Sequence, residues 1–435
     1  LDDLNGLMRN FQENYLMTAR DFAQWGAYED AVLVLKQCTK KYPMLYYYAA
    51  YYEEKMGEDE AAKKSLEKAE SCAFDYCFPN KLDDIAVLTF AIENGCKKKA
   101  PYYLGNLFYD KLQWKKSVEL WEMSEKADDT FSIVHRNLAL AYYNKMGDSK
   151  AAKCELEKAF SLNRKDARIF LELDQLYKKL GYSFKERLAK YDEDPSLAES
   201  RDDLYIEYIT LMNMCGEYER AYRCIMGRRF HPWEGGEGKI TTQYTISLLE
   251  MAKQCLASEK YEQAEKLLKK ALVYPENLGE GKLEGTKDNH LFYHLGLALE
   301  AQGKHDEAKT CFETATIGTD EPAGAMYYND QPADMILYQG LAFEKLGKTR
   351  EAKSRFYRLI DYGEQHLNDE GKIEYFAVSL PDFLIFDEDY TKKNRAHCCY
   401  LMALGNIGLQ NREKAAEFLN EALEIEPSHM MATLY

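Results

Sequence analysis

The sequence predicts an all-α protein built from repeated helical hairpins. A small residue is followed by Leu or an aromatic residue four positions later and by another small residue seven positions later, as in Ala264, Leu268 and Ala271. This spacing follows one face of a helix. The first small residues of nine such copies are Ala31, Ala62, Ser117, Ala152, Ala221, Ala264, Ala308, Ala352 and Ala415. No β-rich segment interrupts them, so we predict an all-α class.

Each copy predicts the second helix of a hairpin, preceded by a turn. A glycine often stands five positions before the small residue, and these glycines are Gly26, Gly57, Gly147, Gly216, Gly303 and Gly347. The upstream helix carries a central glycine at Gly105, Gly296 and Gly340. Small residues at a crossing let two helices approach closely, and large residues nearby fill the groove. Because one hairpin cannot bury its apolar face alone, we expect the hairpins to stack.

The pattern is most complete in the last hairpin, at Ala415, Leu419, Ala422, Leu423 and Pro427. It resembles the tetratricopeptide repeat, a helical hairpin of about 34 residues with small and large residues at the same positions. The resemblance covers nearly the whole chain, apart from a degenerate hairpin around residues 171–191. It implies a right-handed α-solenoid of tetratricopeptide-like hairpins.

The spacing of the hairpins predicts two blocks. Ser117 and Ala152 stand 35 residues apart, whereas Ala264 and Ala308 stand 44 apart. The later repeats are therefore stretched by about ten residues over the usual length. The predicted parts are regular repeats over residues 1–163, a degenerate hairpin or hinge over 164–202, and stretched repeats over 203–435.

The stretched repeats contain inserted loops with a duplicated motif. Gly-Glu-Gly-Lys occurs at residues 236–239 and again at 279–282, each fifteen positions after the key alanine. It lacks the Gly spacing and the Ser or Thr of a phosphate-binding loop. A third loop, 318–332, carries acidic and aromatic residues instead. Insertions of this kind project from one edge of a solenoid, which is often the binding edge.

Candidate binding residues on this loop edge are Arg228, Arg229, His231, Trp233, Glu234, Glu237, Lys239, Glu280, Lys282, Tyr327, Tyr328, Asn329 and Asp330. Glycines permit close backbone approach, and Trp233 offers a flat apolar face. Three interpretations remain open: the loops only reverse long hairpins, they form a docking seam for another domain, or they bind a polar ligand such as a sugar. The basic pair at 228–229 could bind an anion, or it could pair with nearby carboxylates.

A second candidate surface is the groove of the first repeats. Its candidate residues are Tyr47, Tyr51, Tyr102, Asn106 and Asn137. Two of these match asparagine positions of the peptide-carboxylate clamp known in tetratricopeptide proteins, but tyrosines stand where that clamp needs lysine. An aromatic groove could take an extended peptide or a sugar, and the tyrosines could equally be packing residues.

Composition excludes several classes of partner. Fifty-seven basic and 73 acidic residues give a net charge of −16, which disfavours nucleic acid and anionic membranes. The longest apolar run has nine residues, at 44–52, too short for a membrane span. Eleven cysteines without a Cys-x-x-Cys motif indicate reduced thiols, so we expect a cytoplasmic protein.

No catalytic or cofactor motif is apparent, and we expect no enzymatic activity in this chain, no cofactor and no metal. His290 and His294 stand four positions apart and could present two metal ligands. No further His or Cys lies near them in the sequence, so helix packing is the favoured interpretation.

The loops add a narrower resemblance, carried by residues 232–238, 277–281, 327–332 and 374–382. The chain is similar to the C-terminal repeat region of large bacterial proteins in which a mutarotase-like β-sandwich of unknown function precedes the repeats. This implies a scaffold that docks a protein partner or a missing domain of the same polypeptide. The alternative that the resemblance implies is a carbohydrate-linked protein whose loops bind a sugar or complete a glycan-active site.

Overall fold

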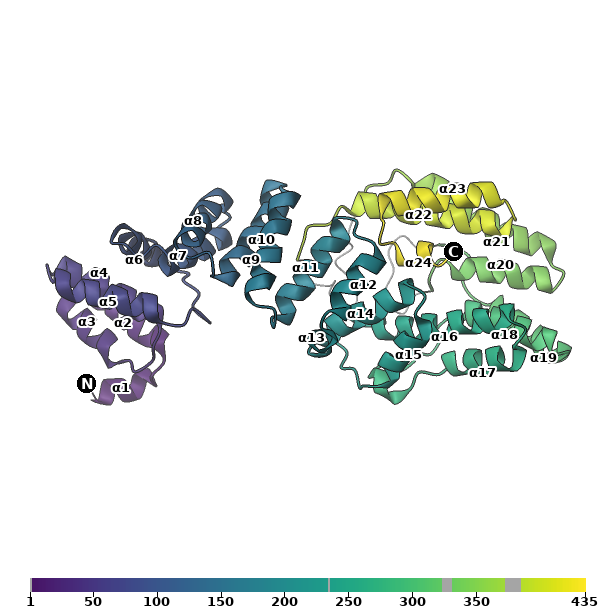
Figure 1. Cartoon of the computed structure of the whole chain (residues 1–435), viewed down its shortest axis with the longest axis horizontal. Helices are drawn as coiled ribbons and strands as arrows, with labels where there is room; N and C mark the ends of the chain where they lie inside the picture. The colour runs from purple at the N-terminus through teal and green to yellow at the C-terminus, as the bar shows by residue number, and fades with distance from the viewer. Residues whose placement is uncertain (1, 234, 323–330, 372–384) are drawn as a thin grey trace. The chain divides into compact units, whose positions relative to one another are not determined.

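The computed structural model describes residues 2–233, 235–322, 331–371 and 385–435. These residues form helices and connecting loops without any strand, as the all-α prediction requires. None of the helices among them is long and apolar enough to cross a membrane. The chain divides into two compact units, Leu1–Arg164 and Lys165–Tyr435, and Figure 1 labels their helices.

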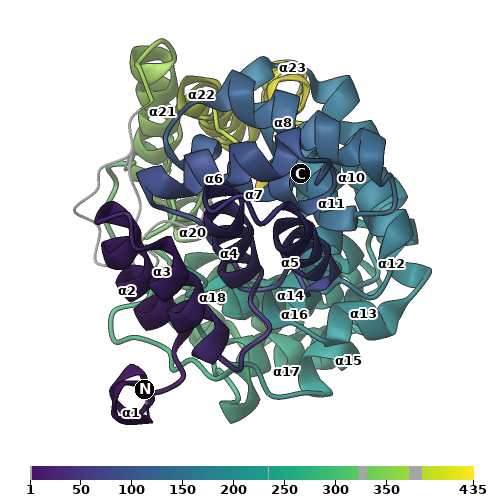
Figure 2. The ribbon, with the colours of Figure 1, turned by 90° about the vertical axis from the view of Figure 1, so that its left-hand side faces the viewer.

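Unit 1 contains α1 (Asp2–Met8), α2 (Gln12–Gln24), α3 (Tyr28–Gln37), α4 (Pro43–Lys55), α5 (Asp59–Ser71), α6 (Leu82–Glu93), α7 (Lys99–Asp110), α8 (Trp114–Ala127), α9 (Ser132–Ala141), the π-helical turn η1 (Tyr142–Met146) and α10 (Ser149–Leu162). The hairpins are α2–α3, α4–α5, α7–α8 and α9–α10, while α6 packs on α4 and α7. Figure 2 shows the first two hairpins as antiparallel pairs.

Unit 2 contains α11 (Ala167–Lys179), α12 (Phe184–Asp192), α13 (Pro195–Glu199), α14 (Asp202–Met214), α15 (Tyr218–Met226), α16 (Lys239–Ala257), α17 (Tyr261–Ala271), the 3-10 turn η2 (Glu276–Leu278), α18 (Asn289–Ala301), α19 (His305–Ala315), α20 (Met335–Lys345), α21 (Thr349–His366), α22 (Tyr390–Gly408), α23 (Arg412–Ile425) and α24 (Met430–Thr433). Consecutive helices from α14 to α23 pair into five hairpins. The first helices of successive hairpins also pack side by side in one layer.

The nine predicted small residues all lie on the second helix of a hairpin, and all nine are buried. The α-solenoid arrangement predicted from their spacing is therefore confirmed. The turn five positions earlier is left-handed in every hairpin. Glycine occupies it in six hairpins, and Leu112, Glu259 and Gln410 occupy it in the other three, with φ of 60°, 58° and 59°. Left-handed backbone costs a non-glycine residue about 1–2 kcal/mol, so packing of the two helices must offset that cost.

At three of the nine hairpin crossings, an aromatic ring of the second helix lies directly on a glycine of the first helix. A Cβ atom added to Gly105 would lie 2.5 Å from the Trp121 ring nitrogen. The same construction places a Cβ of Gly296 2.5 Å from Phe312 and a Cβ of Gly340 2.2 Å from Phe356. These distances are shorter than any van der Waals contact, so these crossings admit only glycine without a shift of the ring or the helix.

The degenerate hairpin α11–α12 is stabilised by a buried network of ion pairs and hydrogen bonds. The Arg187 side chain is 1% exposed, and its Nε and NH2 groups donate to the two carboxylate oxygens of Asp174 at 2.9 and 2.7 Å. NH2 also donates to Glu207 of α14 at 2.6 Å. Tyr191 donates its hydroxyl to Asp174 at 3.0 Å. Loss of one member would leave a buried charge unpaired, which typically costs about 3–5 kcal/mol.

We predict that Gly105→Ala destabilises unit 1 by about 1–3 kcal/mol, the usual cost of overpacking a core. The Trp121 ring cannot rotate away freely, because its Nε1 donates to the Tyr102 carbonyl and to Asn106. Three of the four tryptophans lie in unit 1, so the urea midpoint followed by tryptophan fluorescence mainly reports that unit.

The matched control is Gly6→Ala in helix α1, where no atom lies within 4 Å of an added Cβ. It should be neutral or stabilising, since alanine favours helix over glycine by about 1 kcal/mol. Equal midpoints for the two variants would contradict the close-approach explanation.

Candidate functional site

The two loops with the Gly-Glu-Gly-Lys motif pack against each other. We call residues 228–239 the first loop, residues 274–285 the second loop, and both together the paired loops. The Phe230 amide donates to the Asn277 carbonyl at 2.8 Å. The Asn277 side-chain amide donates to the carbonyls of Ile225 and Arg228 at 2.8 and 2.9 Å. The second loop is therefore fastened to the end of α15 and to the start of the first loop.

The duplicated motif supplies much of this fastening. Gly279 has a φ of 74°, and a Cβ at this position would lie 2.5 Å from the Phe230 carbonyl oxygen. The Glu280 carboxylate accepts the Gly238 amide at 2.8 Å, at the N-terminus of α16, where a negative charge is favourable. Lys282 pairs with Asp288, which precedes α18, at 2.6 Å and donates to the Leu272 carbonyl at 3.1 Å. In the second copy of the motif, Gly279, Glu280 and Lys282 thus each contact residues outside that copy.

The first copy of the motif makes contacts within its own loop. Glu237 accepts the Gly235 amide at 2.8 Å within its own loop. Lys239 begins α16, and its Nζ lies 5.7 Å from the centre of the Trp233 ring. That ring is half-buried against Gly236, whose added Cβ would lie 2.3 Å from it.

The two arginines and the histidine of the first loop all have acidic partners but differ in exposure: Arg229 lies 3.9 Å from Glu276, and His231 Nδ1 lies 3.2 Å from Asp202. Arg228 forms an ion pair with Asp202 and lies 4.6 Å from the centre of the Tyr205 ring. The side chains of Arg229 and His231 are 69% and 77% exposed. With half-buried Trp233, these two side chains form the solvent-facing part of the first loop.

Five candidates of the loop edge lie outside the described residues: Glu234, Tyr327, Tyr328, Asn329 and Asp330. The described start of the third loop is tied to α21, since Asp320 accepts from Arg355 at 2.8 Å and Glu321 pairs with Arg358 at 3.2 Å.

The groove candidates of unit 1 have internal partners. Tyr47 is fully buried and donates its hydroxyl to Glu70 at 2.5 Å. Tyr102 is 6% exposed and packs on Phe131, whereas half-buried Tyr51 packs on Phe90. Asn137 donates to Asn106 at 3.1 Å, so these two candidates meet. Tyr51, Asn106 and Asn137 therefore remain the half-exposed members of this group.

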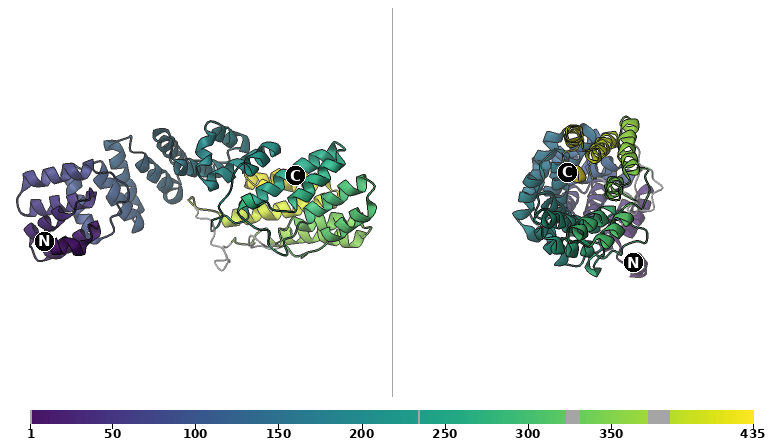
Figure 3. Two further views of the ribbon diagram at one scale, coloured as in Figure 1. Left: turned by 90° about the horizontal axis from the view of Figure 1, so that it is seen from below. Right: turned by 90° about the vertical axis from the view of Figure 1, so that its right-hand side faces the viewer.

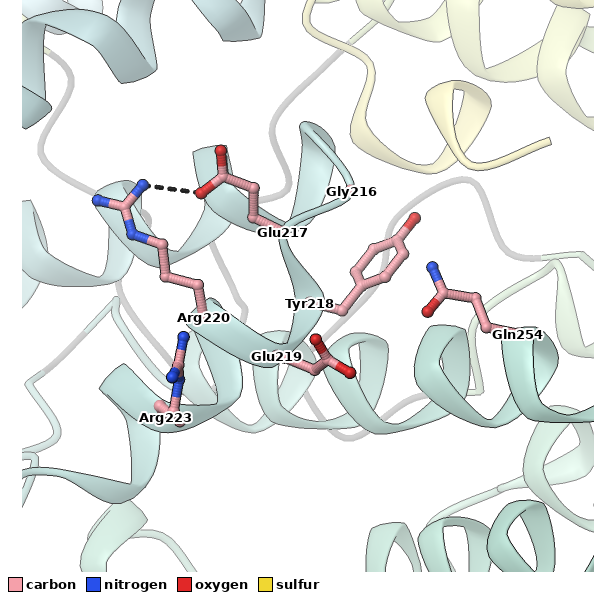
Figure 4. A pocket seen from close by; sticks show the side chains of 7 residues that line it. All are labelled: Gly216, Glu217, Tyr218, Glu219, Arg220, Arg223 and Gln254. Carbon is pink, nitrogen blue, oxygen red and sulfur yellow. Dashed lines mark hydrogen bonds and ion pairs between the residues drawn. The ribbon is translucent and has the colours of Figure 1, made fainter. Parts of the chain in front are cut away.

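A shallow pocket of about 240 Å³ lies at the turn before α15. Figure 4 shows its lining residues, which are Gly216, Glu217, Tyr218, Glu219, Arg220, Arg223 and Gln254. Arg220 donates to Glu217 at 2.7 Å and also pairs with Asp192. Because this guanidinium is already neutralised, the pocket offers an anionic ligand little attraction from it.

The inner face of unit 2 holds the C-terminal segment of the chain, residues 427–435. We define this inner face by the layer of α16, α18, α20 and α22. Figures 1 and 3 show α24 and the C-terminus within the arc of these helices. Met430 accepts from Gln243 of α16 at 3.3 Å, and the Tyr435 hydroxyl lies 2.8 Å from that of Tyr338 of α20. The Tyr400 ring of α22 lies 5.0 Å from His429 and 6.1 Å from Tyr435. One short segment therefore contacts three helices that are far apart in sequence. No sequence motif predicts these contacts.

Buried titratable groups surround this segment. Burial lowers the pKa of His290 to about 3 and those of His294 and His397 to about 4. Burial raises the pKa of the Asp334 carboxyl to about 6. Nδ1 of His294 is 2.7 Å from the His290 carbonyl, so this histidine pair is part of the packing within α18.

Among the described residues, one group has the geometry of a metal site, namely Glu125, His135 and Glu155 of unit 1.

Models of the tetratricopeptide repeat match residues 290–316, 334–362 and 396–429. Tetratricopeptide repeats are detected in these three segments. The matched segments correspond to α18–α19, α20–α21 and α22–α23 with the following turn.

Several solved structures are similar to this chain. A tetratricopeptide repeat protein from Parabacteroides merdae ATCC 43184 has 17% identity and a TM-score of 0.28 over 66% of this chain and 98% of that one. The structure of Naa15/Naa10 bound to HypK-THB has 13% identity and a TM-score of 0.34 over 97% of this chain and 64% of that one. A MamA RS-1 ArsTM double mutant has 15% identity and a TM-score of 0.27 over 44% of this chain and 97% of that one.

We predict that unit 2 loses stability as the pH falls below about 6.5. Three histidines are held neutral in the folded chain with a pKa of about 3 to 4, whereas unfolded histidine has a pKa of about 6.5. The unfolded state therefore binds more protons, and the histidine contribution is complete above pH 6.5 and lost as the pH falls toward 4. Asp334 opposes this, because its raised pKa makes the folded state bind a proton below pH 6.

The net difference of about two protons corresponds to about 2.7 kcal/mol per pH unit near pH 5. Urea midpoints measured by circular dichroism at pH 7, 6 and 5 give this slope. His290→Gln should make it shallower, and the exposed His305→Gln should leave it unchanged. A slope that is identical in all three proteins would contradict the assignment.

Proposed function

We propose that the chain is a non-enzymatic protein-interaction scaffold and that the inner face of unit 2 holds a short peptide in the place of residues 427–435. The observation that carries this proposal is the contact of one short segment with α16, α20 and α22. Its Met430 and Tyr435 contact separate helices, as the anchoring side chains of a bound peptide do in a groove between helices. The partner chemistry is therefore a segment with a thioether and an aromatic side chain five positions apart.

The same segment has the properties of a displaceable occupant. Its only helix, α24, has four residues, and most of its side chains are half-buried or exposed. Tyr435 remains 39% exposed. Elements with few buried contacts open at a small fraction of the global unfolding free energy. A segment from a protein partner, or from another domain of the same polypeptide, could therefore replace residues 427–435.

The paired loops supply a second docking surface in this proposal. Their internal hydrogen bonds make them a rigid edge, and Arg229, His231 and Trp233 face solvent from it. The exposed guanidinium of Arg229 suits an acidic partner surface. A rigid loop pair loses little conformational entropy on binding, which favours affinity.

A carbohydrate ligand at the paired loops is the second candidate function. It is supported by the half-buried indole of Trp233 beside Lys239, since sugars stack on aromatic rings. Calorimetric titration with an oligosaccharide panel tests it, with Trp233→Ala as the control. Saturable heat that this variant abolishes would favour the carbohydrate function over the scaffold.

The peptide proposal predicts that a chain ending at residue 426 binds a labelled peptide of residues 427–435 in solution. The full chain should bind the same peptide at least about tenfold more weakly, because an attached segment competes at an effective concentration in the millimolar range. Fluorescence anisotropy measures both affinities, and circular dichroism checks that the shortened chain is folded.

The control peptide carries alanine at the positions of Met430 and Tyr435 and should bind weakly to both chains. A matched control protein is Tyr357→Phe on the exposed side of α21, where the tyrosine is 52% exposed, to be compared with Tyr338→Phe on the inner face. Equal affinity of the shortened and full chains, or no loss with the alanine peptide, would overturn the proposal.

A further inference from the structure

Three side chains from consecutive helices of unit 1 converge on one point. Glu125 lies near the end of α8, His135 lies on α9, and Glu155 lies on α10. Nδ1 of His135 is 2.6 Å from Glu155 Oε2 and 3.9 Å from Glu125 Oε1. The three potential ligand atoms all lie within 4.8 Å of one another. Helix packing alone brings them together, since they are ten and twenty residues apart in the sequence.

The imidazole ring has a fixed orientation. Its side chain is 2% exposed, and Nε2 lies 2.8 Å from the carbonyl oxygen of Asp129 in the loop between α8 and α9. A carbonyl can only accept, so Nε2 donates to Asp129. Nδ1 faces the two carboxylates and donates to Glu155, and a metal ion would replace the proton on Nδ1. This arrangement is the one usually found for a metal-binding histidine, whose second ring nitrogen donates to a carbonyl or carboxylate.

We propose that unit 1 binds one transition-metal ion of the Zn²⁺ class between Glu125, His135 and Glu155. Zinc–nitrogen and zinc–oxygen bonds are about 2.0–2.2 Å long, so two ligand atoms of a tetrahedral ion lie about 3.3–3.6 Å apart. The ligand atoms lie within 4.8 Å of one another, so side-chain shifts of about one ångström would bring them to that geometry. An imidazole ligand favours zinc and its neighbours over Mg²⁺ or Ca²⁺, which prefer oxygen ligands alone.

The surroundings allow a fourth ligand from solvent. The side chains of Glu125 and Glu155 are 30% and 20% exposed, so water can reach the open side of the ion. Three protein ligands and one water complete a tetrahedral zinc site.

The expected role is structural and goes beyond peptide binding by unit 2. The ion would connect the second helix of hairpin α7–α8 to both helices of hairpin α9–α10. Metal bound only by the folded state stabilises that state in proportion to RT ln(1 + [metal]/Kd). Zinc should therefore raise the unfolding temperature of unit 1.

The experiment is titration of the full chain with ZnCl₂ by isothermal calorimetry, together with thermal unfolding followed by tryptophan fluorescence. The wild-type chain should bind one ion at this site and unfold at a higher temperature with zinc than with EDTA. His135→Gln and Glu155→Gln should each weaken binding by more than about 100-fold, since loss of even an outer-shell partner costs about 10–100-fold. The matched control Glu119→Gln, on the exposed side of α8, should retain binding.

Free thiols could also bind zinc, and Cys154 is exposed beside Glu155. All titrations are therefore repeated in a Cys154→Ser background, which should leave the site intact. If His135→Gln does not fold, as judged by circular dichroism in EDTA, Glu125→Gln at the more exposed ligand replaces it and should weaken binding in the same way. Stoichiometric zinc binding that persists in the ligand variants, or no zinc binding and no thermal shift in the wild-type chain, would overturn the proposal.

Discussion

The close approach of paired helices is the constraint on which the rest of the structure depends. Aromatic rings of the second helix lie directly on glycines of the first, as Trp121 does on Gly105 and Phe312 does on Gly296. Phe356 lies on Gly340 within its own hairpin and also meets Gly408 of the next one, whose added Cβ would be 2.1 Å away. One ring therefore sets the spacing both within and between hairpins. Because these hairpins are held together within the helical layers, the long insertions between hairpins can carry other roles.

The insertions and the C-terminal segment use this rigid frame in different ways. The paired loops are fastened to each other and to the starts of α16 and α18 through Glu280 and Lys282. They form a fixed edge, which suits docking better than a loop that must order on binding. Residues 427–435 are held by a few side chains on three helices. In the proposed scaffold function, the paired loops provide a fixed docking surface, and residues 427–435 occupy the place that a partner peptide would take.

The sequence was sufficient to predict the helical class and the nine hairpins, because small and large residues recur at fixed spacing. It did not reveal that Leu112, Glu259 and Gln410 occupy the same left-handed turn position as the glycines, since these residue types do not indicate such a backbone. The Arg187 network and the cluster of Glu125, His135 and Glu155 were also not foreseen. Their members come from separate helices and meet only through packing. Duplication of the Gly-Glu-Gly-Lys motif indicated the importance of the loops, but the contact between the two copies arises only in the fold.

A double-mutant cycle at the crossing of α20 and α21 is the most direct test of this constraint. Gly340→Ala, Phe356→Leu and the double variant would be compared with the wild-type chain by their free energies of urea unfolding. If the ring and the glycine oppose each other directly, Gly340→Ala should be costly beside phenylalanine and much less costly beside leucine, with a coupling of about 0.5–3 kcal/mol, as for residues in contact. Additive effects, with the same cost of Gly340→Ala in both backgrounds, would contradict the central role of the glycine–aromatic crossing.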